Sequence, residues 1–153
     1  MSAFRFSLGR LLDLRKNEEQ KRATSVARAR KESESARKAR EDLLSIHRAG
    51  REKVAEAHRI GGAVGVLRNM ELLLERVEDH VKDADQVCQE TDERLVESIK
   101  DYTVAVRERH SLDRLRDRRL EEWKVEEARK DQKEIDEVAI TRHGRRALEA
   151  PGV

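Results

Sequence analysis

Residues 67–112 read LRNMELLLERVEDHVKDADQVCQETDERLVESIKDYTVAVRERHSL, and the spacing of their apolar side chains predicts the fold. Steps of three and four residues connect fourteen positions across this stretch, and eleven of the fourteen are apolar. Because an α-helix repeats about every 3.6 residues, these positions share one face, as in the seam of a coiled coil. The fourteen seam positions are Leu67, Met70, Leu74, Val77, Val81, Ala84, Cys88, Thr91, Leu95, Ser98, Tyr102, Ala105, Arg109 and Leu112.

The first half of the chain contains a second seam that is poorer in large apolar residues. Its small side chains would let a partner helix approach closely, but they would bury little apolar area. The expected positions are Val26, Ala29, Ser33, Ala36, Arg40, Leu43, His47, Gly50, Val54, Ala57 and Gly61.

A cluster of glycines at residues 61–65, GGAVG, separates the two seams and concentrates backbone freedom in one place. Two helices joined by such a turn pack antiparallel as an αα-hairpin. The sequence therefore predicts an all-α fold of two long helices in an antiparallel coiled-coil hairpin, with the second helix longer and overhanging the first. We expect a single domain over residues 1–153, with helices at about 8–60 and 66–143, the turn at 61–65 and a frayed tail at 144–153.

Local signals set the expected ends of the helices. Ser7 can cap the first helix, and Gly144 follows the cationic residues Arg142 and His143 as an expected C-terminal cap. The overhang contains Trp123, which is expected either to pack on the phenylalanines near the N-terminus or to contact a partner protein.

The composition favours long helices over an ordinary globular enzyme fold. Charged residues make up 43% of the chain, well above the roughly 25% usual for globular domains, and only Phe4, Phe6, Tyr102 and Trp123 are aromatic. The net charge is only +2, because acids and bases nearly cancel. The single cysteine, and the lack of a signal-like or membrane-spanning apolar run, lead us to expect a soluble protein of the cytoplasm.

The sequence contains no motif that indicates a catalytic site. The five histidines are scattered without zinc-site spacing, and the glycine cluster lacks the Gly-Lys-Ser/Thr ending of a phosphate loop. We therefore expect no enzyme activity, no metal and no cofactor. We also expect no nucleic acid partner, because Asp113, Asp117 and the glutamates that follow neutralise the arginine-rich run at 114–119. The apolar and basic residues at 4–14 could contact a membrane, the second helix or a partner protein.

Three segments have a pattern beyond the seam. Residues 4–15, FRFSLGRLLDLR, space Phe and Leu and end in Leu-Arg. Residues 118–123, RRLEEW, place an aromatic residue within a charged helix, and residues 131–139, DQKEIDEVA, contain the run Gln-Lys-x-hydrophobic-Asp-Glu. All three segments resemble the corresponding segments of the flagellar export protein FliJ family. The resemblance spans nearly the whole chain, and its specific part lies at the two ends.

The resemblance implies an antiparallel hairpin, similar to the central stalk of rotary ATPases, that has no active site of its own. Such a stalk would bind the hexameric flagellar export ATPase and the export gate protein FlhA, couple the ATPase to protein export and escort export chaperones. It would be monomeric when alone, and its partners would hold it at the cytoplasmic face of the inner membrane.

The resemblance also implies two partner-binding surfaces. The ATPase-binding end would consist of the helix termini, and the gate-binding patch would lie nearer the turn, where Val77 and Ala84 also fit plain seam packing. The implied ATPase-binding residues are Phe4, Leu8, Leu11, Leu12, Arg15, Trp123, Gln132, Asp136 and Glu137, and the implied gate-binding residues are Leu73, Val77, His80 and Ala84.

Three other functions stay open at the level of sequence. The seam alone would also suit a homodimeric coiled-coil spacer or scaffold. The equivalent stalk of a virulence-type type III secretion system would share the same size and charge. An RNA- or DNA-binding rod that uses the arginine-rich run is the third alternative.

Overall fold

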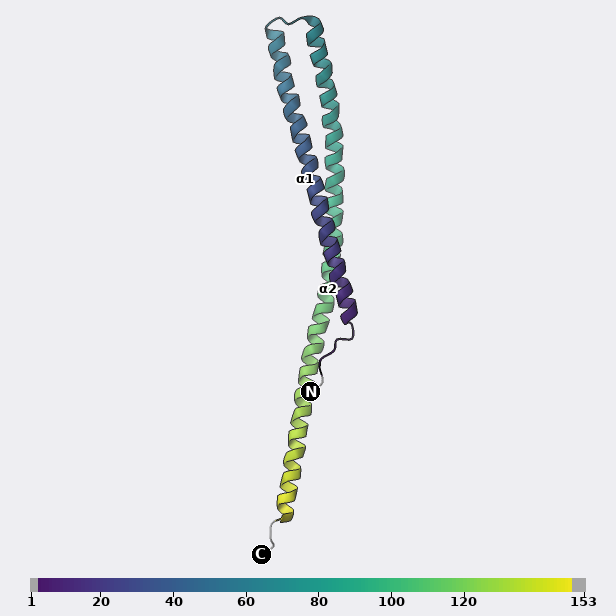
Figure 1. The fold of residues 1–153 in the computed structure, drawn as a ribbon, viewed down its shortest axis with the longest axis vertical. Coiled ribbons are helices and arrows are strands. Elements are labelled where there is room, and N and C mark those ends of the chain that lie inside the picture. Colours follow the sequence, from purple (N-terminus) through teal and green to yellow (C-terminus); the bar gives the residue numbers. More distant parts are fainter. Residues whose placement is uncertain (1–2, 150–153) are drawn as a thin grey trace. The chain divides into compact units, whose positions relative to one another are not determined.

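The computed structural model describes residues 3–149, and it describes side-chain environments for residues 3–144. Helix α1 spans Gly9–Arg59 and helix α2 spans Val64–Glu149, and the described residues contain no strand (Figure 1). With 86 residues, α2 is much longer than α1, which has 51 residues. The two helices pack against each other, so the predicted all-α helical hairpin is confirmed.

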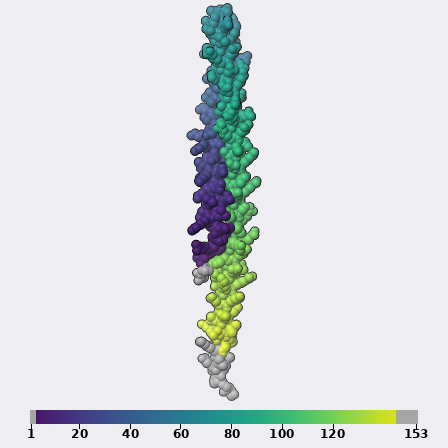
Figure 2. Space-filling view, turned by 90° about the vertical axis from the view of Figure 1, so that its right-hand side faces the viewer, coloured from purple at the N-terminus to yellow at the C-terminus, as the bar shows by residue number. Residues whose placement is uncertain are grey.

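Contacts divide the chain into two compact units. We call residues 17–106 the turn unit and residues 1–16 with 107–153 the end unit. Within the turn unit the helices run antiparallel, because Arg22 pairs with Asp101 far from the turn and His58 pairs with Glu71 close to it. The two helices of the turn unit lie against each other in the space-filling view (Figure 2). The expectation of one domain over the whole chain stays a prediction.

The turn between the helices is built on a glycine in the left-handed conformation. Gly61 has a φ of 74°, and it is the one residue with a positive φ that the described part of the chain contains. The Gly62 N–H donates to the Ala57 carbonyl at 2.9 Å, and the Gly61 N–H donates to the His58 carbonyl at 3.3 Å. These two bonds form a Schellman motif, which satisfies the last carbonyls of α1 and stops the helix.

Helix α2 begins at Val64, two residues before the predicted start, so the turn is shorter than the predicted 61–65. The Ala63 carbonyl accepts hydrogen bonds from the N–H groups of Val66 at 3.0 Å and Leu67 at 3.1 Å, so Ala63 is the N-cap residue. Gly65 lies inside the first turn of α2, where the chain requires no positive φ. The extra glycine in the cluster therefore misled the prediction of the turn.

Two predicted helix ends were also wrong. The first helical bond of α1 runs from the Leu12 N–H to the Leu8 carbonyl at 3.0 Å, so Leu8, and not Ser7, occupies the capping position. At the other end, α2 continues through Gly144 to Glu149. A capping glycine must adopt a positive φ, and Gly144 does not, because helix-forming residues follow it. Residues 150–153 of the predicted tail lie outside the described part of the chain.

The seams are confirmed almost position by position. All fourteen seam residues of α2 are buried or half-buried, and so are the seam residues of α1 except Gly61, which forms the turn. The most buried seam residues are small: Ala29, Ser33, Thr91 and Ala105 are each at most 7% exposed. The helices therefore approach closely over a thin apolar core, and pairing within one chain provides the contact for which a straight helix would need a second copy.

Candidate functional site

An aromatic contact joins the N-terminal segment to α2 within the end unit. The rings of Phe4 and Trp123 lie 6.0 Å apart, centroid to centroid, and are tilted by 54°. Both side chains are half-buried, and Leu12 nearby in sequence is only 4% exposed. Of the two environments expected for Trp123, the structure therefore shows packing on the N-terminal segment. This contact brings two of the predicted ATPase-binding residues together.

The other N-terminal residues of the predicted ATPase-binding end differ in how accessible they are. Arg15 Nη1 forms an ion pair with Glu108 Oε2 at 2.7 Å, which ties the beginning of α1 to α2. Leu8 and Leu11 are each 38% exposed, so they retain apolar surface that another molecule could cover. Arg15 therefore has a role within the hairpin, and the two leucines are better placed to meet a partner.

The C-terminal members of the predicted ATPase-binding end form a separate group. Gln132 Nε2 donates to Asp136 Oδ1 at 2.9 Å, one helical turn away, and Glu137 is exposed beside them. Gln132 follows Trp123 by nine residues, or about 14 Å along the helix axis. The structure therefore does not bring this group to the aromatic contact. All residues from 128 to 144 are exposed, so this part of α2 has no packing partner within the described chain.

The predicted gate-binding patch divides into two pairs of residues. Leu73 is 59% exposed and His80 is exposed, so both can reach another molecule. Val77 and Ala84 are half-buried at seam positions, where they pack between the helices. Because a substitution at Val77 or Ala84 would disturb the hairpin itself, only Leu73 and His80 test gate binding cleanly.

A polar layer between the helices was not predicted from the sequence. Ser33 Oγ donates to Asp92 Oδ1 at 2.5 Å, and Arg37 Nη2 donates to Asp92 Oδ2 at 2.9 Å. The hydrogen bond from Ser33, followed by that from Arg37, holds the pKa of the Asp92 carboxyl below its usual range. The same contact with Asp92 raises the pKa of Arg37. The available signal was a buried seam position occupied by serine, but its partner lies beside the seam, where periodicity gives no warning.

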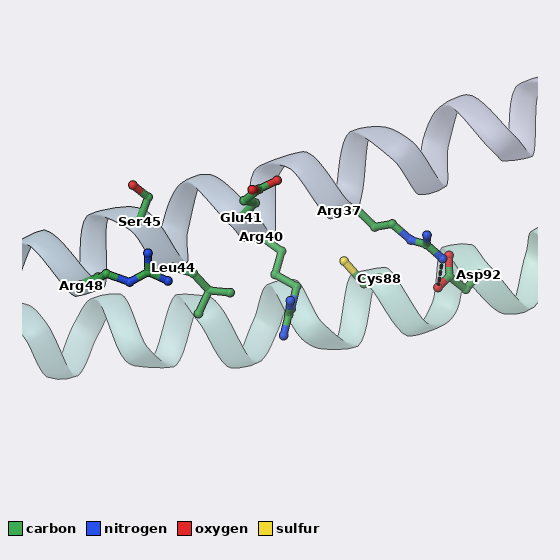
Figure 3. A pocket seen from close by; sticks show the side chains of 8 residues that line it. All are labelled: Arg37, Arg40, Glu41, Leu44, Ser45, Arg48, Cys88 and Asp92. Atoms are coloured by element: carbon green, nitrogen blue, oxygen red, sulfur yellow. Dashed lines mark hydrogen bonds and ion pairs between the residues drawn. The ribbon is translucent and has the colours of Figure 1, made fainter.

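The same region contains an open groove of about 690 Å³ between the helices (Figure 3). Arg40, which lines the groove, donates to Asp85 on the other helix, and this contact raises the pKa of Arg40. Three charged lining residues, Arg37, Arg40 and Asp92, are thus engaged in pairs between the helices. Its lining residues are Arg37, Arg40, Glu41, Leu44, Ser45, Arg48, Cys88 and Asp92.

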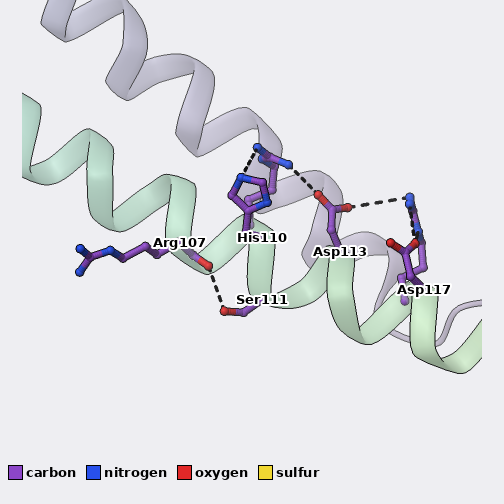
Figure 4. Close-up of polar contacts among 7 residues, drawn as sticks. Arg107, His110, Ser111, Asp113 and Asp117 are labelled. Atoms are coloured by element: carbon purple, nitrogen blue, oxygen red, sulfur yellow. Dashed lines mark hydrogen bonds and ion pairs between the residues drawn. The ribbon is translucent and has the colours of Figure 1, made fainter.

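The arginine-rich run has an internal arrangement that the sequence interpretation missed. Asp113 pairs with Arg109 at 2.6 Å and approaches Arg116 at 3.9 Å, and Asp117 pairs with Arg116 at 3.0 Å (Figure 4). Of the arginines at 114–119, Arg116 is thus the one that Asp113 and Asp117 contact directly. The spacing of four residues between Arg109 and Asp113, and of three between Asp113 and Arg116, was the signal that could have revealed two of these pairs.

Within the described residues, no group of three or more His, Cys, Asp or Glu side chains is arranged to hold a metal ion. Over the same residues, neither helix contains a stretch that is long and apolar enough to cross a bilayer.

One of three comparisons with known proteins identifies a family for this chain. The sequence matches the family described as Flagellar FliJ protein over residues 4–148, which is nearly the whole chain. Searches of curated proteins and of solved structures each gave no match.

Proposed function

The chain belongs to the FliJ family, and from this membership we propose that it is the non-enzymatic stalk that binds the hexameric export ATPase of the flagellar type III export apparatus. We further propose that it couples this ATPase to export, binds the export gate protein FlhA and escorts export chaperones. Membership of this family implies that the chain is a component of flagellar protein export. The individual partners and the surfaces that bind them are our proposal.

The unpartnered end of α2 supports ATPase binding best. Beyond the contact between Phe4 and Trp123, every side chain from 128 to 144 is exposed. Helices in proteins take most of their stability from packing, so a long helical segment without a packing partner favours engagement by another molecule. All nine residues of the predicted ATPase-binding end belong to the end unit, which contains this segment.

The exposed segment also presents apolar surface among its charges. Ile135 is 62% exposed, Val138 is 54% exposed and Ile140 is 71% exposed. Burying such side chains against a partner would be favourable by about 25 cal/mol for each Å² of apolar area. A helix with its side chains is about 10–12 Å wide, a shape that can enter the pore of a ring-shaped ATPase. Such a stalk would act by binding and would contribute no catalytic group.

An ATPase assay tests this proposal with matched variants. We expect the triple substitution Gln132→Ala, Asp136→Ala and Glu137→Ala to reduce stimulation of the purified export ATPase. A control triple on the same exposed segment, Arg129→Ala, Asp131→Ala and Glu134→Ala, should leave stimulation near the wild-type level. Circular dichroism should show unchanged helicity in both variants. Full stimulation by the first variant would remove these three residues from the ATPase-binding surface.

Gate binding is tested separately, because its candidate residues lie in the turn unit. Leu73→Asp should weaken binding to the purified cytoplasmic domain of the gate protein, since it places a charge on a 59% exposed apolar residue. Leu72→Asp is the matched control, because Leu72 is the neighbouring residue and is 49% exposed. Both variants should still stimulate the ATPase. Equal gate binding by the two variants would contradict the assignment of Leu73.

A further inference from the structure

We propose that one outward face of α2, formed by Arg107, Arg114 and Arg118, is an electrostatic docking surface for a cluster of Asp and Glu side chains on the export ATPase. We call it the arginine face. The inference rests on the proposed function and deepens it, because it names the chemistry of the surface that the stalk would meet. It depends on how the charges in this stretch of α2 are paired.

The stretch from 107 to 119 contains six arginines and three acids, and the acids have other partners. Glu108 pairs with Arg15 at 2.7 Å, while Asp113 and Asp117 pair with arginines inside the stretch. Arg119 pairs with Glu122 at 3.3 Å. The carboxylates are thus largely committed to the hairpin and to neighbouring helical turns.

The three arginines of the arginine face have no such partner. Arg107, Arg114 and Arg118 are exposed, and none of them makes an ion pair or a side-chain hydrogen bond with another described residue. Figure 4 shows the Arg107 side chain extending from α2 into open space. The guanidinium groups of these three arginines can therefore form ion pairs with a partner protein.

Helical spacing aligns these arginines in one row. Steps of seven and four residues place them on the same side of α2, roughly opposite Leu112, which is half-buried. The row is about 16 Å long at 1.5 Å per residue. His110 and Ser111, which lie between these arginines on the same side, are not acidic. The hairpin leaves this basic surface uncovered in the same unit that contains the predicted ATPase-binding end.

The charges that follow decide between kinds of partner. Residues 121–137 contain eight acids and four bases, so the helix turns acidic directly after the arginine face. A membrane or a nucleic acid is anionic over a long distance, and it would repel this acidic stretch within about one Debye length, roughly 8–10 Å, of the arginines. A folded protein can present carboxylates opposite the arginines alone. The change of sign along α2 therefore favours a protein surface with a local acidic cluster.

Exposed charges such as those of the arginine face act mainly on the rate of association when they lie at the edge of an interface. Complementary charges steer the encounter between proteins, and the gain falls as salt rises. We expect the triple variant Arg107→Gln, Arg114→Gln and Arg118→Gln to associate with the ATPase about tenfold more slowly than the wild type at low salt. In about 1 M salt, where the Debye length is roughly 3 Å, the two rates should converge.

The experiment measures association of the full chain with the purified ATPase hexamer over a range of salt concentrations. A control triple, Lys31→Gln, Lys38→Gln and Lys53→Gln, removes the same charge from exposed residues of the turn unit that have no ion-pair partner among the described residues. A third variant with lysine at the three arginine positions retains the charge. Slower association by the Arg→Gln variant alone, with a flatter salt dependence, would support the arginine face.

Other results would overturn the inference. If the wild type associates with the hexamer and the two Gln variants associate at equal rates, the arginine face is refuted and the proposed function stands. No association by the wild type would refute both. Anionic vesicles of phosphatidylethanolamine and phosphatidylglycerol, and a short DNA duplex, serve as alternative probes. Tighter binding of either probe than of the hexamer, lost in the Arg→Gln variant, would assign the face to that anion instead.

Discussion

The Ser33 hydroxyl on α1 donates a 2.5 Å hydrogen bond to the Asp92 carboxylate on α2. Ser33 is 3% exposed, so this bond lies in the middle of the packing between the helices, where an apolar side chain would be usual. A polar residue within a coiled-coil seam stabilises less than a well-packed pair of apolar residues, but with its partner in place it can fix which residues face each other. The Ser33–Asp92 bond thus ties the two arms of the turn unit in one alignment.

Replacing this serine should destabilise the hairpin. We expect Ser33→Ala to lower the free energy of unfolding by about 1 kcal/mol, because the Asp92 carboxylate loses a donor and water replaces it only in part. Urea unfolding followed by circular dichroism measures the loss. Ser35→Ala, at an exposed position one half-turn away, should change the free energy little. An equal effect of the two substitutions would show that the hydrogen bond adds nothing to stability.

The same bond makes stability depend on pH. Hydrogen bonds from Ser33 and then Arg37 lower the pKa of Asp92 in the folded state. The ionised Asp92 carboxylate therefore contributes its full share to the free energy of unfolding above the ordinary Asp pKa of about 3.9. This contribution is lost as the pH falls through the lower pKa of the folded state. Unfolding free energies of the wild type and of Asp92→Asn should converge as the medium is acidified. A constant difference at all pH values would contradict this linkage.

The aromatic contact in the end unit should be visible by fluorescence, because Trp123 is the only tryptophan of the chain. Phe4→Ala should expose the indole to water and shift its emission to longer wavelength. Val125→Ala, two residues from Trp123 at a position that is 51% exposed, should leave the emission unchanged. A double-mutant cycle between Phe4 and Trp123 should give a coupling of about 1 kcal/mol. Unchanged emission in Phe4→Ala would mean that the contact is not populated in solution.

A close approach of the two arms occurs at Gly50. A Cβ atom added there would lie 2.6 Å from Leu74 Cδ2, so Gly50→Ala forces the leucine to move. The gain in helix propensity, about 1 kcal/mol, should be cancelled or exceeded by this overpacking, which typically costs about 1–3 kcal/mol. In a Leu74→Ala background, Gly50→Ala should stabilise instead. Gly65→Ala, with nothing within 4 Å, is the control that should not destabilise.

The turn should depend on the left-handed conformation of Gly61. Gly61→Ala should lower the free energy of unfolding by about 1–2 kcal/mol, because a Cβ atom clashes with the backbone at a φ of 74°. Gly61→Asn should lose less, since asparagine tolerates this conformation better. Thermal unfolding compares the two variants. Equal stability of Gly61→Ala and the wild type would mean that the turn can rearrange.

The end motifs named residues for the candidate site, but they did not reveal which of those residues are accessible. The end motifs identified Phe4 and Trp123, and the structure brings their rings together. The same motifs gave no sign that Leu12 is buried or that Arg15 is engaged with Glu108. A local motif does not specify contacts with the opposite helix. It therefore cannot distinguish a side chain that packs inside the hairpin from one that is accessible to a partner.

The sequence by itself determined the two helices and the faces on which they pack. Apolar and small residues at steps of three and four allow burial only along one stripe, and local backbone preferences at the glycines place the turn near residue 61. Only the tertiary structure decided which charges find partners. Asp92 binds Ser33 and Arg37, whereas Arg107, Arg114 and Arg118 are left exposed. The physical reason is that burial follows from the periodicity of a single helix, while an ion pair between helices requires the distance between residues far apart in the chain.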